Sequence, residues 1–147
     1  MDLVVKRFDK LSLEELYEIL RVRVAVFVVE QHCPYQEMDY KDLHAYHVFL
    51  KDQNGIQAYL RALDRGVSFD EAALGRVLTV KRGCGLGSRI LSEGIKTAQE
   101  KFHADRIKIE AQSYAKGFYE KAGFKQVSGE FLEDGIPHIL MLLDLNT

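Results

Sequence analysis

A glycine-rich turn between an apolar run and an amphipathic helix constrains this chain more than any other feature of its sequence. The run Ala73–Val80 is apolar and partly β-branched, as a central strand is. Apolar residues recur at helical spacing from Gly85 to Phe102. The chain between them reads Lys81-Arg82-Gly83-Cys84-Gly85-Leu86-Gly87-Ser88. This pattern predicts a strand that passes directly into a helix through closely spaced glycines.

The predicted turn has the chemistry of a phosphate-binding site. The first turn of a helix exposes unpaired N–H groups and a partial positive charge, and glycines let an anion approach them closely. The glycines could instead only form a tight turn, but the neighbouring Lys81-Arg82 pair favours a phosphate ligand. We expect the ligand's phosphates to bind at the contiguous residues Arg82, Gly83, Cys84, Gly85, Leu86, Gly87 and Ser88.

Two common phosphate-binding motifs do not match this turn. No Gly-Lys-Ser or Gly-Lys-Thr follows the glycines, so the nucleoside triphosphate motif is absent. Ser88 stands where the dinucleotide fingerprint needs its third glycine, and the turn follows the fourth predicted strand instead of the first. The pattern that does match is Arg-x-x-Gly-x-Gly, formed by Arg82, Gly85 and Gly87.

The rest of the chain predicts an α/β fold with a mixed sheet. Ser12 and Glu15 have the spacing of a capping box, at the start of a helix whose apolar stripe is Leu13, Leu16, Leu20, Val24 and Phe27. We expect a functional loop over Val28–Leu43, and a short helix through Tyr119 that ends at Gly123. The further predicted strands are Leu3–Arg7, Tyr46–Lys51, Ile56–Leu63, Arg106–Gln112, Lys125–Phe131 and His138–Leu145. This order predicts one domain, residues 1–147, with helices on both faces of a single central sheet.

Composition narrows the possible partners and compartment. The chain carries 20 Lys and Arg against 22 Asp and Glu, a net charge of −2, which disfavours nucleic acid as a partner. No run reaches the roughly 18 apolar residues that a membrane span needs, and no signal peptide is evident, so we expect no membrane association. Cys33 and Cys84 lack the spacing of a metal site, so we expect no metal, free thiols and a cytoplasmic location.

The turn motif and a second segment together resemble the GNAT acetyltransferase superfamily. The run Ala115-Lys-Gly-Phe-Tyr119-Glu-Lys-Ala-Gly-Phe124 is similar to the superfamily's second signature, with Gln112 at the usual Asn position. Two stretches, Phe27–Tyr35 and Glu133–His138, resemble the ElaA-type branch. The resemblance then spans nearly the whole chain and implies a GNAT-like acyl-CoA N-acyltransferase fold.

The resemblance implies direct transfer of the acetyl group of acetyl-CoA to a primary amine of a small molecule. Arg82, Gly85 and Gly87 would bind the cofactor's pyrophosphate, and Gln112 would contact the cofactor. The strand carrying Leu78 to Val80 would part from the strand carrying Ile109 to Gln112, and unpaired backbone groups near Leu78 and Val80 would bind the pantetheine arm. A homodimer through the C-terminal strands is common in the superfamily.

Each catalytic residue that the resemblance implies also has an alternative role or a competing candidate. Tyr119 matches the tyrosine that protonates the departing thiolate, although it could only fill space on its helix. Glu110 shares a strand face with Gln112 and is a candidate general base, or else a solvated strand residue. Glu30 and His138 are competing candidates on the acceptor side. The loop carboxylates Glu30, Glu37, Asp39, Glu133 and Asp134 would attract a protonated amine.

Two other functions fit part of the sequence. A CoA-binding domain without transferase activity, which regulates or supports a partner protein, would need Arg82, Gly85 and Gly87 but not Tyr119. Acetylation of a protein tail is a further alternative, which no sequence feature specifies. The identity of the acceptor depends on loop shape, which one sequence does not determine.

Overall fold

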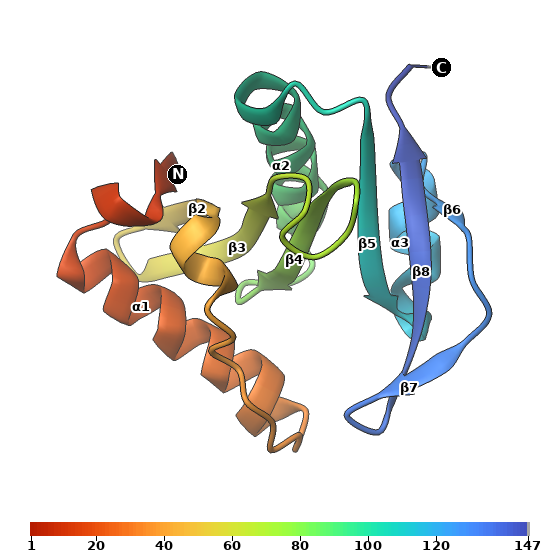
Figure 1. Cartoon of the computed structure of the whole chain (residues 1–147). Helices are drawn as coiled ribbons and strands as arrows, with labels where there is room; N and C mark the ends of the chain where they lie inside the picture. Colours follow the sequence, from red (N-terminus) through yellow and green to blue (C-terminus); the bar gives the residue numbers. More distant parts are fainter. Residues whose placement is uncertain (147) are drawn as a thin grey trace.

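The computed structural model describes residues 1–146 and forms one mixed sheet flanked by helices (Figure 1). Its strands are β1 (Asp2–Arg7), β2 (Tyr46–Asp52), β3 (Gly55–Leu63), β4 (Ala72–Thr79), β5 (Arg106–Gln112), β6 (Lys125–Gln126), β7 (Phe131–Glu133) and β8 (Ile136–Asp144). Its α-helices are α1 (Leu13–Val24), α2 (Leu86–Phe102) and α3 (Lys116–Lys121). The predicted α/β class, with a single mixed sheet, is confirmed.

The strands lie in the order β1-β2-β3-β4-β5-β8-β6, and β7 also pairs with β8. All neighbours are antiparallel except β4 and β5, which are parallel. The predicted hairpin between β2 and β3 is present, with the turn at Gln53 and Asn54, and Gly55 begins β3 opposite Asp52. No helix in residues 1–146 is long and apolar enough to cross a membrane.

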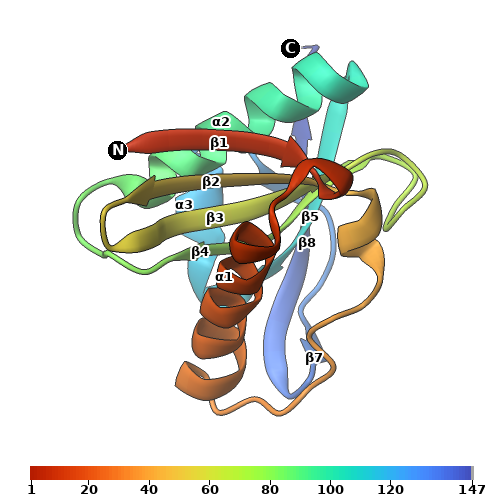
Figure 2. The same cartoon turned by 90° about the vertical axis from the view of Figure 1, so that its left-hand side faces the viewer.

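Helices α1 and α2 cover opposite faces of the sheet (Figure 2). On β2 and β3, alternate residues Val48, Leu50 and Leu60 join the core beneath α2. Their neighbours Phe49 and Tyr59 join the core beneath α1. Because successive side chains of a strand point to opposite faces, two separate cores form, and the central strands are buried on both sides. Helix α3 packs on the same core as α2.

Strands β4 and β5 part soon after they begin. Their only paired residues are Ala72 with Ile107 and Ala73 with Lys108. Beyond this point the β3–β4 register shifts by one residue, and Arg76 adopts a left-handed backbone with φ 53°. A bulge of this kind bends its strand and interrupts pairing. Figure 1 shows β4 and β5 diverging below their shared upper end. The parting that the superfamily resemblance implies is therefore present.

Three features of the secondary structure differ from the sequence prediction: the buried face of α1, the start of the loop and the strand predicted over Lys125–Phe131. The capping box at Ser12 and Glu15 is confirmed, but Leu13 is 86% exposed, and the buried face of α1 carries Ile19, Val22 and Arg23. The helix runs on from α1 as a π-helical segment, Ala25–Glu30, so the loop begins later than predicted.

The third difference is the strand predicted over Lys125–Phe131, which is two short strands, β6 and β7. The interruption has a local cause, because the Leu140 N–H donates to the side-chain oxygen of Ser128 at 2.8 Å in place of a backbone carbonyl. The backbone of the interrupted segment therefore leaves the ladder between β6 and β7.

The contact between α2 and β3 gives a test of the packing. A methyl group added at Gly94 would lie 2.5 Å from a terminal carbon of Leu60, which is fully buried. Gly94→Ala should therefore lower the free energy of unfolding by about 1–3 kcal/mol, despite the better helix propensity of alanine. In the matched control Gly117→Ala, the added methyl meets nothing within 4 Å. This control should keep or raise stability by up to about 1 kcal/mol. Equal changes in the free energy of unfolding for Gly94→Ala and Gly117→Ala, measured by urea unfolding, would contradict the close packing of α2 on β3.

Candidate active site

A cleft of about 990 Å³ occupies the space where β4 and β5 part. It passes through the sheet, because its lining includes Gly87 and Tyr119 on the side of α2 and α3. The lining also includes Glu110, Gln112 and His138. These three alternate with Ile109, Ala111 and Ile139, which face the α2 core, and so they lie on the opposite face. The cleft can therefore admit two molecules from opposite faces of the sheet.

The N-terminus of α2 opens at one end of this cleft. Its first helical hydrogen bond joins the Arg89 N–H to the Gly85 carbonyl at 3.2 Å, so the N–H groups of Leu86, Gly87 and Ser88 have no carbonyl partner within the helix. Gly85 has φ 77°, and a methyl group added there would meet nothing within 4 Å. The open space and the free donors fit a phosphate group.

The remaining residues of the loop are arranged around this helix end. Gly83 has φ 78° and Cys84 is exposed, with its thiol directed to the carbonyl of Lys81 at 3.7 Å. Gly87 has a packing role, because a methyl group there would lie 3.3 Å from the Phe118 ring. The absence of a side chain at Gly87 therefore lets α2 approach α3.

Arg82 lies at the mouth of the cleft and pairs with Glu30. One of its terminal nitrogens is 2.5 Å from the Glu30 carboxylate, and both side chains are about half exposed. This hydrogen bond lowers the pKa of Glu30. Glu30 was predicted to bind the acceptor, but the structure instead places it beside the predicted phosphate-binding arginine. It is therefore positioned to compete with an anion for Arg82.

Unpaired backbone groups were predicted near Leu78 and Val80, and these two residues are themselves paired with β3. The Val80 N–H donates to the carbonyl of Gln57 on β3 at 2.8 Å, and Leu78 is paired with Tyr59 of the same strand. Because N–H groups of successive residues point to opposite sides of a strand, those of Val77 and Thr79 face the gap. The buried Leu78 side chain still lines the cleft.

Tyr119 lies on α3 between the rings of Phe118 and Phe124, whose centroids are 5.0 and 5.8 Å away. Its side chain lines the cleft, and its hydroxyl has no hydrogen-bond partner within residues 1–146. Burial raises the pKa of this phenol. The hydroxyl is therefore protonated at neutral pH and is free to donate a hydrogen bond into the cleft.

Glu110 and His138 are diagonal neighbours on β5 and β8, since His138 lies opposite Gln112. Burial raises the pKa of Glu110, and the nearby Glu133 carboxylate raises it further. His138 Nδ1 lies 2.7 Å from the carbonyl of Ile136, to which it donates, and the ring stacks against Phe131. Nε2 of His138 is then the acceptor nitrogen. A carboxylate with a raised pKa can take a proton from an amine.

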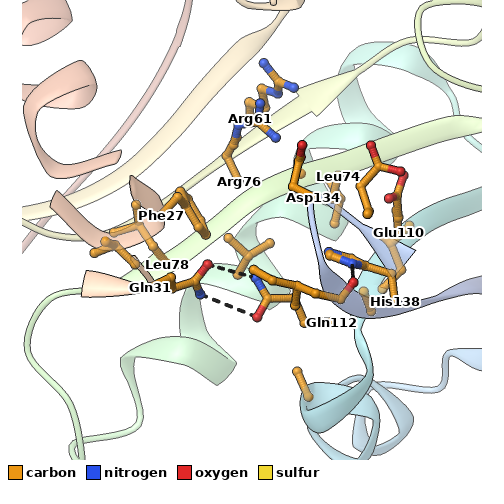
Figure 3. Close-up of a pocket in the computed structure, with 18 of the residues that line it drawn as sticks. Phe27, Gln31, Arg61, Leu74, Arg76, Leu78, Glu110, Gln112, Asp134 and His138 are labelled. Carbon is orange, nitrogen blue, oxygen red and sulfur yellow. Dashed lines mark hydrogen bonds between the residues drawn. The ribbon is translucent and has the colours of Figure 1, made fainter. Parts of the chain in front are cut away.

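Gln112, predicted to contact the cofactor, is paired with Gln31 (Figure 3). The two side-chain amides exchange hydrogen bonds at 3.2 and 3.4 Å, which link the end of the π-helical segment to β5 across the cleft. Gln31 was not predicted to be part of the site. It lies in the Phe27–Tyr35 stretch but 81 residues from its partner, so no local pattern shows the pair.

A closed ring of charges supports one wall of the cleft. Going round the ring, each side chain pairs with the next: Arg23, Glu37, Arg76, Asp39, Arg61 and Asp42, which returns to Arg23. The pair distances run from 2.6 to 3.5 Å. Burial alone would raise the pKa of Asp39, but hydrogen bonds from Arg61 and the charges of Arg61 and Arg76 lower it to about 2.

The ring corrects the predicted role of two loop carboxylates. Glu37 and Asp39 are neutralised by arginines and are not free to attract an amine. Glu133 and Asp134 do line the cleft, with Asp134 at the β7–β8 turn. Among residues 1–146, no group of three or more His, Cys, Asp or Glu side chains could hold a metal ion.

Comparison with known proteins agrees with this geometry. A family model described as an acetyltransferase (GNAT) domain matches residues 11–145. The chain is 35% identical to the protein ElaA of Escherichia coli over 137 residues, which cover 90% of each protein. It is similar to an acyl-CoA N-acyltransferase structure from Pseudomonas aeruginosa, with a TM-score of 0.91, 35% identity, and coverage of 97% of this chain and 99% of that one.

The crystal structure of Escherichia coli ElaA gives a TM-score of 0.90 at 32% identity, and covers 97% of this chain and 99% of that one. These relatives support transfer of an acyl group from an acyl-CoA. The family match, the relatives and the cleft beside the α2 N-terminus lead to one conclusion: the chain belongs to the GNAT acetyltransferase family, and ElaA is one of its relatives.

Proposed function

We propose that this protein transfers the acetyl group of acetyl-CoA directly to a primary amine of a small molecule. The observation that carries the proposal is the cleft through the sheet, which has the free N-terminus of α2 at one end and Glu110 with His138 at the other. A donor and an acceptor entering from opposite faces would meet where β4 and β5 part. The two free cysteines support a reducing compartment such as the cytoplasm.

The donor end has the groups that a CoA ester needs. The N–H groups of Leu86, Gly87 and Ser88 and the charge of Arg82 would hold the pyrophosphate. The N–H groups of Val77 and Thr79, which face the gap, would bind the pantetheine arm by extending the edge of β4. Acetyl-CoA supplies an acyl group already activated as a thioester.

The acceptor end and Tyr119 have the groups for proton transfer. The amine nitrogen forms a bond to the thioester carbonyl carbon, the carbon–sulfur bond breaks, and the amine loses one proton. Glu110 would take that proton, because its raised pKa makes it a better base than an ordinary carboxylate. The Tyr119 hydroxyl would give a proton to the sulfur, a role supported by its lack of a hydrogen-bond partner within residues 1–146.

A direct assay tests the proposed transfer. The purified protein is supplied with acetyl-CoA and a panel of polyamines, amino acids and aminoglycosides, and the release of free thiol is followed. We expect release that depends on at least one primary amine and yields the acetylated amine by mass spectrometry. If CoA binds but no amine in a wide panel is acetylated, the chain is instead a CoA-binding domain without transferase activity.

The role of Tyr119 gives a second prediction. Tyr119→Phe removes only the hydroxyl and should lower kcat by about 100-fold or more, since a general acid contributes this much. The dissociation constant for CoA should change little, because the ring still packs between Phe118 and Phe124. Tyr17→Phe, on the exposed side of α1, is the matched control. Unchanged turnover of Tyr119→Phe at every pH would remove the assignment.

A further inference from the structure

We propose that the acceptor is an amino acid or a related amino carboxylate, whose carboxylate binds Arg76 and Lys41 while its amine lies beside Glu110. This inference rests on the proposed acyl transfer and names the substrate class of the same cleft. It follows from the division of charge between two facing walls. Figure 3 shows Arg61 and Arg76 on one side of the cleft, with Asp134, Glu110 and His138 on another.

Arg76 is held in place but keeps donors free. Its Nε and one terminal nitrogen, Nη2, donate to Glu37 at 2.6 and 3.0 Å, and Nη2 also lies 3.5 Å from Asp39. The other terminal nitrogen, Nη1, has no partner within residues 1–146. The guanidinium lies over the Tyr35 ring at 5.5 Å, and 21% of the side chain is exposed. Two N–H donors of a fixed cation are thus available to a ligand in the cleft.

Lys41 adds a positive charge that no ion pair within residues 1–146 neutralises. The charged ring contains three arginines and three carboxylates, so its own charges balance. Lys41 also lines the cleft, and its backbone N–H donates to the Asp39 carboxylate of the ring at 3.1 Å. Its ammonium group makes no ion pair with the described part of the chain. This wall therefore carries a net positive charge, which suits an anionic group on the acceptor.

The facing wall has the opposite charge. Glu110, Glu133 and Asp134 line it, and none of the three side chains forms an ion pair within residues 1–146. The two walls are close enough to interact, because the charges of Lys41 and Arg76 both lower the pKa of Glu110. A zwitterion can satisfy both walls at once, with its ammonium group bound at the carboxylates and its carboxylate at the cations. The ammonium group gives one proton to water before the nitrogen attacks, and Glu110 takes the second. An amine that has no carboxylate can pair only with the acidic wall.

The backbone at Arg76 provides independent support. A residue other than glycine rarely adopts φ near +53°, and such conformations persist where the surrounding structure enforces them, often at functional sites. Here the left-handed turn lies in the bulge that opens the cleft, and Arg76 is itself a cleft residue. The bulge therefore brings a cation to the acceptor end, next to the point where β4 leaves β5.

Matched acceptors test the proposal without any mutation. L-α-amino acids and ω-amino acids of one to five methylenes are each compared with their carboxamide and with the amine lacking the carboxyl group, and acetyl-CoA is held at saturation. For the best acid, kcat/KM should exceed that of its carboxamide by about tenfold or more, because two charge-assisted contacts are lost in the amide. The difference should lie mainly in KM, since the carboxylate takes no part in bond making or bond breaking at the thioester.

Two variants test the residues. In Arg76→Asn, chosen because asparagine tolerates a left-handed backbone, and in Lys41→Gln, the acid-to-carboxamide ratio of kcat/KM should fall at least about fivefold. Lys41→Gln removes no contact from the charged ring, so it keeps the test valid if Arg76→Asn unfolds. Arg106→Gln, an exposed arginine at the start of β5, is the control and should leave the ratio unchanged.

The outcomes separate this inference from the proposed function. If amines without a carboxylate are acetylated as well as or better than the acids, acyl transfer stands and the amino carboxylate assignment is wrong. An unchanged acid preference in both variants would also refute the assignment to Arg76 and Lys41. If no amine of either class is acetylated, the proposed transfer and this inference fail together.

Discussion

The closed ring of alternating charges that includes Arg76 is the constraint on which the functional part of this fold depends. It joins α1, through Arg23, to β3, to the bulge of β4 and to the long segment that follows the π-helical turn. Arg23 and Glu37 are almost fully buried, so removing one partner would leave an unpaired charge inside the protein. By fixing the bulge, the ring directs β4 away from β5, and the cleft exists because these strands part.

The cleft has two ends with different chemistry, and each end is built in a different way. The donor end is local, since one short segment supplies the glycines, the helix N-terminus and Arg82. The acceptor end is assembled from the bulge, the charged ring, β5 and the β7–β8 turn. Gln31 and Gln112 join the two walls between these ends, and Glu30 pairs with Arg82 at the mouth. Binding of the acyl donor must therefore compete with the Glu30–Arg82 pair and with the Gln31–Gln112 hydrogen bonds.

The same division explains how far the sequence predicts the structure. Strand and helix periodicity predicted most elements, and the Ser12 capping box and the Gly85 helix start depend on neighbouring residues. The ring was not predicted, because Glu37 pairs with residues 14 and 39 positions away in the sequence. Arg23 does fall four residues after the buried Ile19, which hints at a buried arginine, but nothing local identifies its partners. The sequence located the unpaired backbone groups only near Leu78 and Val80, because the ladder register decides which N–H groups face the gap.

Binding of the acyl donor depends most on the N–H groups at the start of α2, and an amide NMR titration with CoA measures them directly. We expect the largest shifts at Leu86, Gly87 and Ser88, where no helical carbonyl accepts the N–H groups. Pantetheine, which lacks the pyrophosphate, should bind more weakly and leave these three signals nearly unmoved. No measurable affinity for CoA, or shifts confined to another part of the protein, would contradict the account.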